Sequence, residues 1–120
     1  MIPAMRFRAA QRLRTRADFD RSRRDGYRAD CGAFILRILP LRDASLPGQR
    51  RLGVIASRKV GCAVKRNRAK RQFREIFRLN QEKLPTSCDV IIIVRAAYEQ
   101  FSFQELQERF LNAVIKCHLK

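Results

Sequence analysis

The sequence predicts an α+β fold, a small sandwich in which helices pack against one central sheet. Two observations lead to this prediction. Apolar residues follow helical or strand periodicity in the order helix, strand, strand, helix, strand, helix. The chain has 120 residues, 46% of them hydrophobic, which suffices for one modest core. Because no repeat or linker-like tract divides the chain, we expect residues 1–120 to form a single domain, with residues 1–14 flexible.

A short helix is expected near the N-terminus. Thr15 is a suitable N-cap, Asp18 falls in the first turn, and Gly26 supplies a stop. The apolar content of this segment is small, with Ala17 and Phe19 as its main members.

Two strands should follow. Residues 31–39 alternate, so that one face carries Phe34, Leu36 and Ile38 and the other carries Ala33, Ile35 and Arg37. Residues 40–50 contain a Pro-Gly pair and are expected to form a loop. The second strand is expected at residues 52–57.

A basic turn at residues 58–61 should lead into a helix of about 18 residues at 64–81. Pro85 closes this region, and residues 89–95 form the third strand. Residues 90–94 are a continuous apolar run, which is typical of a central strand buried on both faces.

The last helix has the clearest start. Ser102 and Glu105 match a capping box, and Phe101 with Leu106 fits a hydrophobic staple. Residues at helical spacing then form one apolar stripe, namely Phe103, Leu106, Phe110, Val114 and Cys117.

Charge is the most unusual property of the chain. The formal net charge is +16, with 27 Lys and Arg against 11 Asp and Glu. Residues 1–28 carry +6 and residues 58–78 carry +8, so the basicity is local, as a binding surface requires. Such a charge favours a polyanion as the binding partner, either nucleic acid or an anionic membrane surface.

Because no apolar run approaches the roughly 20 residues of a membrane helix and no secretory signal is present, we expect a cytoplasmic protein without membrane association.

Catalytic and metal-binding patterns are missing from the sequence. The four cysteines are far apart, which favours reduced and mostly buried thiols over a disulfide framework or a zinc site. The single histidine, His118, is adjacent to Cys117, a poor arrangement for chelation. The acids are scattered, so a self-sufficient nuclease or metal-dependent hydrolase is the weakest interpretation.

The helix predicted at 64–81 has a distinct basic flank. Its apolar stripe contains Ala69, Phe73, Ile76 and Phe77. Beside this stripe, one flank carries Asn67, Lys70, Arg71, Arg74 and Arg78. The alternative to a binding surface is a solvated face balanced by ion pairs, but Glu75 is the one acid available to it. We therefore expect phosphate binding, because the guanidinium fork matches phosphate.

Phe19 has two possible roles. It lies among basic residues on a short polar helix, where it could stack on an unpaired base. It could equally dock the helix on the sheet.

The basic region resembles the "RNR" signature of the bacterial ribonuclease P protein subunit. The matching residues are SRKVG at 57–61, Ala63-Val64, RNRAKR at 66–71 and Arg74. Flanking matches include Arg12-Leu13, Asp18-Phe19, Gly26, residues 52–54 and 89–92, so the resemblance covers roughly residues 12 to 115.

The resemblance implies a fold like one domain of a small-subunit ribosomal protein, with a left-handed β-α-β crossover. The general rule for parallel strands would instead give a right-handed crossover between residues 52–57 and 89–95.

The resemblance also implies a function. The protein would join a large catalytic RNA, as a monomer in a 1:1 particle that removes the 5′ leader from precursor tRNA by endonucleolytic hydrolysis. The protein alone would not be catalytic, and Mg²⁺ would be held mainly by RNA.

The implied RNA-contacting set comprises Arg66, Asn67, Arg68, Lys70, Arg71 and Arg74, extended by the neighbouring Arg58, Lys59, Lys65 and Arg78. A cleft between the N-terminal helix and the sheet would bind the single-stranded leader, lined by Phe19, Arg23, Ala33, Ile35 and Arg37. Three positions depart from the family pattern: Ser22 replaces an apolar residue, and Arg23 and Arg37 each replace an aromatic one. A guanidinium can also stack, but it adds charge to the cleft.

Two further interpretations come from other classes. A ribosomal or general single-strand RNA-binding protein would share the charge without needing a leader-sized cleft. A DNA-binding protein could use residues 64–81 as a recognition helix, but the sequence shows no preceding helix-turn partner.

Overall fold

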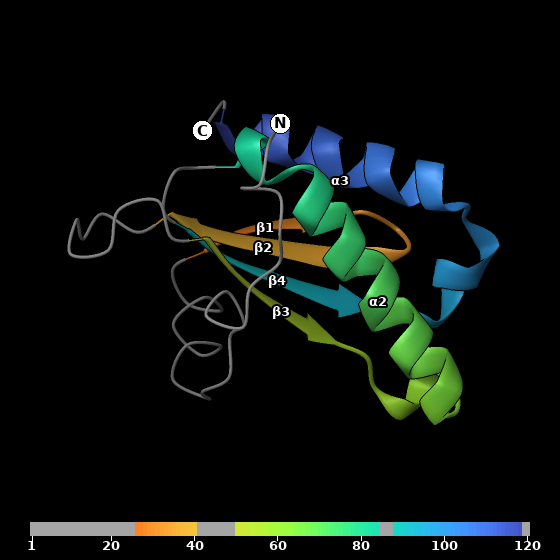
Figure 1. The fold of residues 1–120 in the computed structure, drawn as a ribbon. Helices are drawn as coiled ribbons and strands as arrows, with labels where there is room; N and C mark the ends of the chain where they lie inside the picture. The colour runs from red at the N-terminus through yellow and green to blue at the C-terminus, as the bar shows by residue number, and fades with distance from the viewer. Residues whose placement is uncertain (1–25, 41–49, 85–87, 119–120) are drawn as a thin grey trace, which may run out of the picture.

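The computed structural model describes residues 26–40, 50–84 and 88–118, and Figure 1 shows how they are arranged. The strands are β1 (Tyr27–Asp30), β2 (Phe34–Pro40), β3 (Arg50–Ile55) and β4 (Cys88–Val94). The α-helices are α2 (Ala63–Leu79) and α3 (Phe103–His118), with short 3₁₀ helices η3 (Arg58–Val60), η4 (Gln81–Lys83) and η5 (Ala96–Gln100). The predicted α+β class is confirmed. The expected N-terminal helix and the flexibility of residues 1–14 lie outside the described residues.

The four strands form one sheet in the order β1-β2-β4-β3. β4 pairs antiparallel with β2 and parallel with β3. Its residues are buried on both faces apart from Ile93, which is partly exposed. This confirms the prediction, made from its unbroken apolar run, that this strand is central.

β1 is a strand that the sequence analysis did not predict. It pairs antiparallel with β2, while residues 31–33 form the turn between them. The expectation of a strand beginning at residue 31 is therefore wrong by three residues. Gly32 explains the turn, because its φ of 80° is in the left-handed region and its N–H donates to Asp30 Oδ1 at 3.0 Å.

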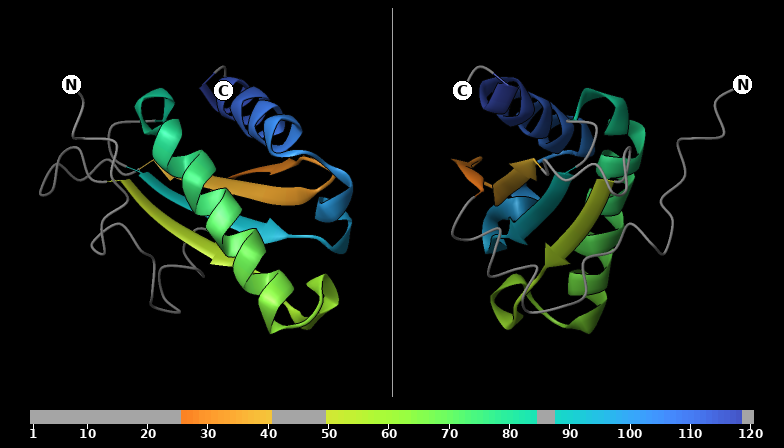
Figure 2. Two further views of the ribbon diagram at one scale, coloured as in Figure 1. Left: turned by 45° about the vertical axis from the view of Figure 1, so that its right-hand side comes forward. Right: turned by 90° about the vertical axis from the view of Figure 1, so that its left-hand side faces the viewer.

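The connection from β3 through α2 to β4 is left-handed. In Figure 1 both strands run to the right, β4 lies above β3, and α2 returns to the left in front of the sheet. The turned views in Figure 2 also show α2 on this face of the sheet, the face that lies toward the viewer in Figure 1. The handedness implied by the family resemblance thus holds against the general rule for parallel strands.

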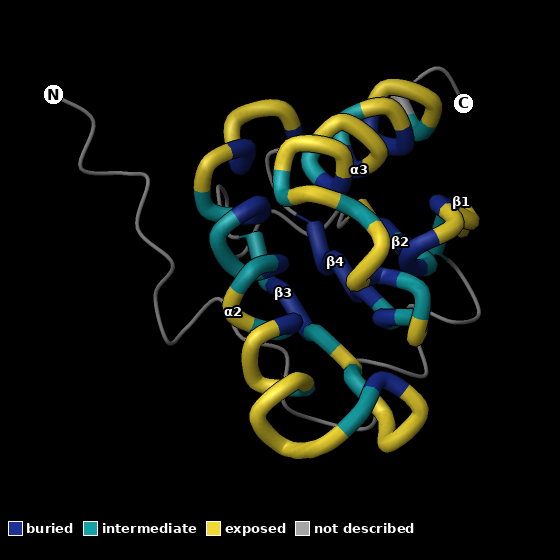
Figure 3. Tube along the Cα trace, turned by 90° about the vertical axis from the view of Figure 1, so that its right-hand side faces the viewer, coloured by how far each residue is buried: buried dark blue, intermediate teal, exposed yellow. Residues whose placement is uncertain are grey.

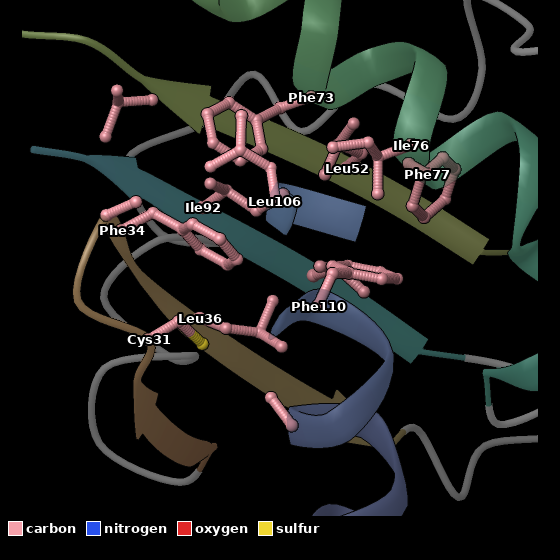
Figure 4. Close-up of a cluster of buried hydrophobic side chains, with 14 of the residues drawn as sticks. Cys31, Phe34, Leu36, Leu52, Phe73, Ile76, Phe77, Ile92, Leu106 and Phe110 are labelled. Atoms are coloured by element: carbon pink, nitrogen blue, oxygen red, sulfur yellow. The ribbon is translucent and has the colours of Figure 1, made fainter. Parts of the chain in front are cut away.

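The core lies between the sheet and the two α-helices (Figure 2). α2 supplies Phe73, Ile76 and Phe77 to it, and α3 supplies Leu106 and Phe110 (Figure 4). The strands contribute the faces that carry Phe34, Leu36 and Ile38 on β2, Leu52 on β3, and Val90 and Ile92 on β4. Phe34 and Phe73 meet edge to face with ring centroids 4.9 Å apart, which ties α2 to the sheet.

The helix boundaries agree closely with the prediction. α2 begins one residue earlier and ends two residues earlier than the predicted range of 64–81.

The capping box of α3 is confirmed in both directions. The N–H of Ser102 donates to Glu105 Oε1 at 2.9 Å, and the N–H of Glu105 donates to Ser102 Oγ at 3.1 Å.

All four cysteines are free thiols. Cys31 and Cys88 are buried, and burial raises the pKa of the first to about 11 and that of the second to about 12. Cys62 is exposed at the N-cap of α2.

In the described parts of the chain, no helix is both long and apolar enough to cross a membrane.

Candidate nucleic-acid interface

The start of α2 is built from a short basic segment. The N–H of Lys59 donates to Ser57 Oγ at 3.3 Å, and η3 follows with Arg58 and Lys59 exposed. No acidic residue occupies the first turn of α2, so the positive end of the helix dipole is not offset there by a carboxylate of that turn. The N–H of Lys65 lowers the pKa of the Cys62 thiol at this end. This end of α2 is therefore suited to an anion.

The burial of α2 determines which of its cations reach solvent. Ala69, Phe73, Ile76 and Phe77 face the core and are fully buried. The remaining sides are exposed or half-buried, as the colouring of α2 in Figure 3 shows. The apolar stripe predicted from periodicity is confirmed, and it divides the surface of the helix into two flanks.

One flank carries half of the predicted RNA-contacting set, namely Asn67, Lys70, Arg71, Arg74 and Arg78. The positions recur three or four residues apart and so share one side of the helix. Asn67 and Arg71 are exposed, while Lys70 is half-buried. Among the described residues, neither Lys70 nor Arg71 forms an ion pair with a carboxylate.

Glu75 neutralises the end of this flank. Arg78 Nε donates to Glu75 Oε2 at 3.0 Å, and hydrogen bonding to Arg78 is the main reason that the pKa of Glu75 is lowered. The carboxylate therefore engages Arg78, one turn beyond Arg74, and leaves Lys70 and Arg71 available to a ligand.

The other flank faces η5 and carries Lys65 and Arg68. Lys65 Nζ lies 3.8 Å from Glu99 Oε1, and the hydroxyl of Tyr98 donates to the carbonyl oxygen of Lys65 at 3.3 Å. Nine of the ten predicted RNA-contacting residues are thus divided between two flanks and the η3 segment, and the tenth is Arg66. Helical spacing predicted that Lys70 and Arg71 share a flank, but no sequence signal indicated that η5 would lie beside Lys65.

Arg66 lies between the flanks, partly buried. Its Nε is buried and has no hydrogen-bond partner in the described parts of the chain. A buried donor without an acceptor is uncommon in folded proteins, and an anion could satisfy it.

The sheet face opposite the helices carries the predicted cleft residues that are described. Ile35 and Arg37 are both half-buried there. Arg37 is paired in register with the exposed Arg28 on one side and with the buried Ile91 on the other, so two arginines are neighbours on this face. Ala33 lies in the turn before β2 and is fully buried in the core cluster, so its side chain offers no surface to a ligand. Phe19, Ser22 and Arg23 lie outside the described residues.

An ion pair that the sequence did not reveal lies on the same face. Arg51 Nε donates to Asp89 Oδ1 at 2.8 Å, and Arg51 Nη2 donates to Asp89 Oδ2 at 2.9 Å. The Asp89 side chain is fully buried, whereas that of Arg51 is 23% exposed. The two residues are adjacent in the parallel register of β3 and β4. This bidentate ion pair holds β3 and β4 together on the sheet face next to Ile91.

Possible metal ligands are sparse in the structure. Residues 26–40, 50–84 and 88–118 contain no group of three or more His, Cys, Asp or Glu side chains that could hold a metal ion.

Comparison with known proteins places this geometry in one family. The sequence profile of the Ribonuclease P family matches residues 7–118. The chain is 35% identical over 99 residues to the ribonuclease P protein component of Herpetosiphon aurantiacus, covering 82% of this chain and 77% of that protein. It is 33% identical over 112 residues to that of Syntrophobacter fumaroxidans, covering 92% and 91%.

Solved structures show the same fold. The RNase P protein from Thermotoga maritima superimposes with a TM-score of 0.73 at 31% identity, covering 88% of this chain and 96% of that one. The RNase P protein of Staphylococcus aureus gives a TM-score of 0.73 at 29% identity, covering 89% and 94%.

Proposed function

The chain belongs to the ribonuclease P protein family, and we propose on this premise that it binds a catalytic RNA and assists that RNA in removing the 5′ leader from precursor tRNA. The protein is a subunit of the tRNA-processing ribonucleoprotein, and its own contribution is RNA binding rather than chemistry. We propose that one monomer joins one RNA in the particle.

The observation that carries this proposal is the concentration of cations on and beside α2. Arg58, Lys59, Lys70 and Arg71 are held by a helix and its leading turn, and the other side of that helix is anchored in the core. A rigid helix presents these charges at fixed spacing, so they can contact successive phosphates of a structured RNA. Arg66 supports the same role, because its buried Nε would gain an acceptor from a phosphate.

The protein would act on catalysis through electrostatics. Two RNA molecules, the catalytic RNA and the precursor tRNA, repel each other through their phosphates. Cations on α2 offset this repulsion, so the affinity for substrate and the occupancy of metal sites on the RNA rise together. We propose that Mg²⁺, which supplies the activated water for phosphodiester hydrolysis, is held mainly by RNA.

The helix-free face of the sheet is the proposed site of the leader. Ile35 gives it a half-buried apolar residue, Ile91 lies buried beneath the surface next to Arg37, and Arg28 is paired with Arg37 in the register of β1 and β2. An apolar surface bordered by guanidinium groups suits a short unpaired strand, whose bases stack while its phosphates meet the arginines. Phe19 and Arg23 complete this proposed cleft, with Arg37 in the place of a stacking ring.

Reconstituted cleavage tests the proposed function. Precursor tRNA is incubated at low Mg²⁺ with the protein alone, with the catalytic RNA from the same organism alone, and with both. Leader removal is expected with both together and not with the protein alone. Robust cleavage by RNA-free protein would overturn the non-catalytic role. Failure of the protein to stimulate the RNA would favour a general RNA-binding protein.

A second experiment tests the leader site. Affinities of the assembled particle for precursor and mature tRNA are measured for the Arg37→Ala protein. We expect weaker binding of precursor tRNA and unchanged binding of mature tRNA, because mature tRNA has no leader. Lys116→Ala removes an exposed cation of α3 and is the matched control. Equal losses for both tRNAs in Arg37→Ala would contradict the assignment.

A further inference from the structure

A groove lies on the flank of α2 that faces η5. It has a volume of about 350 Å³ and is lined by Lys65, Arg68, Gln72, Tyr98, Glu99 and Phe101. A volume of this size lies within the range of sites that bind small molecules, roughly 300–1,000 Å³. Half of the lining comes from η5 and the residue after it, which are outside the basic helix.

The polar groups of the groove are mostly available to a ligand. In the described parts of the chain, the side chains of Arg68 and Gln72 make no hydrogen bond or ion pair. Lys65 and Glu99 form only a loose pair at 3.8 Å, with side chains 55% and 45% exposed. Such a pair contributes little to stability and exchanges readily for contacts with a ligand.

The two aromatic residues that line the groove are held more firmly than its polar side chains. Tyr98 is buried, donates its hydroxyl to the Lys65 carbonyl oxygen, and packs beside Phe73 with ring centroids 6.5 Å apart. Phe101 is held by the guanidinium of Arg109, whose central carbon lies 4.5 Å from the ring centroid. The groove is therefore preformed between two anchored aromatic residues.

We propose that this groove binds one unpaired nucleotide of RNA. Its phosphate would meet Arg68 and Lys65, and its base would enter between Gln72 and Glu99. Two cations explain the affinity for phosphate, and the loosely paired Glu99 and Gln72 add a carboxylate and an amide, respectively, to the same groove. A base edge matches these two groups, because it offers both donors and acceptors.

Guanine is the base that fits this pair best. Its N1–H and exocyclic N2–H are two parallel donors that one carboxylate, that of Glu99, can accept. Its O6 accepts from the side-chain amide of Gln72. Adenine presents an acceptor at N1, which would face the carboxylate unfavourably. The groove would thus distinguish guanine from other bases, which the proposed phosphate contacts of α2 cannot do.

This inference rests on the proposed RNA-binding role of α2, but its test uses no catalytic RNA. Guanosine 5′-monophosphate (GMP), adenosine 5′-monophosphate (AMP) and inorganic phosphate are titrated into the full-length protein, and amide shifts are followed by NMR. GMP should perturb Gln72, Glu99 and Phe101 saturably. AMP should bind about tenfold more weakly. Inorganic phosphate should perturb the surroundings of Lys65 and Arg68 without reaching Gln72.

Three variants separate the contributions. Arg68→Gln should weaken GMP binding about tenfold, whereas Arg71→Gln, which removes the same charge on the opposite flank, should change it less than about twofold. Glu99→Gln should remove the preference for GMP over AMP. NMR spectra of each variant without ligand verify that it is folded.

Several outcomes would overturn the inference. These are the absence of saturable shifts at the groove, equal losses in Arg68→Gln and Arg71→Gln, and equal binding of GMP, AMP and phosphate. None of these outcomes would decide whether the original protein stimulates cleavage by the catalytic RNA. Conversely, failure of the protein to stimulate a catalytic RNA would leave binding of GMP to the groove intact, so the two failures are distinguishable.

Discussion

At the scale of single residues, Asp89 shows best what the sequence could not reveal. Its carboxylate is fully buried, and the two hydrogen bonds from Arg51 satisfy both oxygens. The two residues are far apart in the sequence, and their contact depends on the register of two parallel strands, which no local pattern specifies. By contrast, the basic flank containing Lys70 and Arg71 could be predicted, because it follows from helical periodicity alone.

The Asp89→Asn substitution should be strongly destabilising. It removes the charge of the buried carboxylate that accepts two hydrogen bonds from Arg51, which costs about 3 kcal/mol of the free energy of unfolding. Urea denaturation measures this quantity. Glu108→Gln, which alters an exposed carboxylate on α3, is the control and should have little effect. Equal stabilities of Asp89→Asn and the original protein would show that the charge of the Arg51–Asp89 ion pair contributes nothing to the free energy of unfolding.

At the scale of elements, local signals located the long helices and failed for β1. α3 carries a capping box and an apolar stripe, so both its start and its buried face could be predicted. β1 has four residues with alternating burial, too few for periodicity to stand out. It becomes a strand because β2 offers it hydrogen-bonding partners, which is a tertiary effect.

The capping box should give α3 a pH-dependent stability. The N–H of Ser102 is the main cause of the lowered pKa of Glu105. A carboxyl whose pKa is lowered on folding stabilises the folded state above its ordinary pKa, and the effect disappears as the pH falls through the lowered value. Glu105→Ala should therefore be less stable than the original protein at neutral pH, with the difference shrinking in acid.

Thermal unfolding across this pH range measures the difference. Glu108→Ala, which removes a carboxylate one turn further along α3, is the control and should show a smaller dependence. A difference for Glu105→Ala that stays constant into acid would contradict the role of its charge.

The β1–β2 turn should depend on glycine at position 32. Its φ of 80° is costly for other residues, and an added Cβ would lie 3.1 Å from Arg109 Nη1. Gly32→Ala should lower the free energy of unfolding by roughly 1–2 kcal/mol. Gly32→Asn should cost less, because asparagine tolerates the left-handed region better. Equal costs for the two variants in urea denaturation would mean that backbone conformation is not the cause.

At the scale of the whole molecule, the fold separates two surfaces. α2 displays cations on one side of the sheet, and the face bearing Ile35 and Arg37 lies on the other. The sequence predicted the class and the layers, since these follow from the order of elements. It did not predict the left-handed crossover from its own pattern, because the general rule gives the opposite hand. That feature came only from resemblance to the family.

We propose that the α2 flank containing Lys70 and Arg71 binds phosphates of the catalytic RNA. Salt dependence of the affinity for that RNA tests it most directly, because each phosphate contact releases counterions. For Arg71→Ala, the slope of log affinity against log salt should become shallower by roughly 0.7 to 0.9. For Lys116→Ala, which removes an exposed cation on α3, the slope should be unchanged. An unaltered slope in Arg71→Ala would contradict the claim and show that this flank is merely solvated.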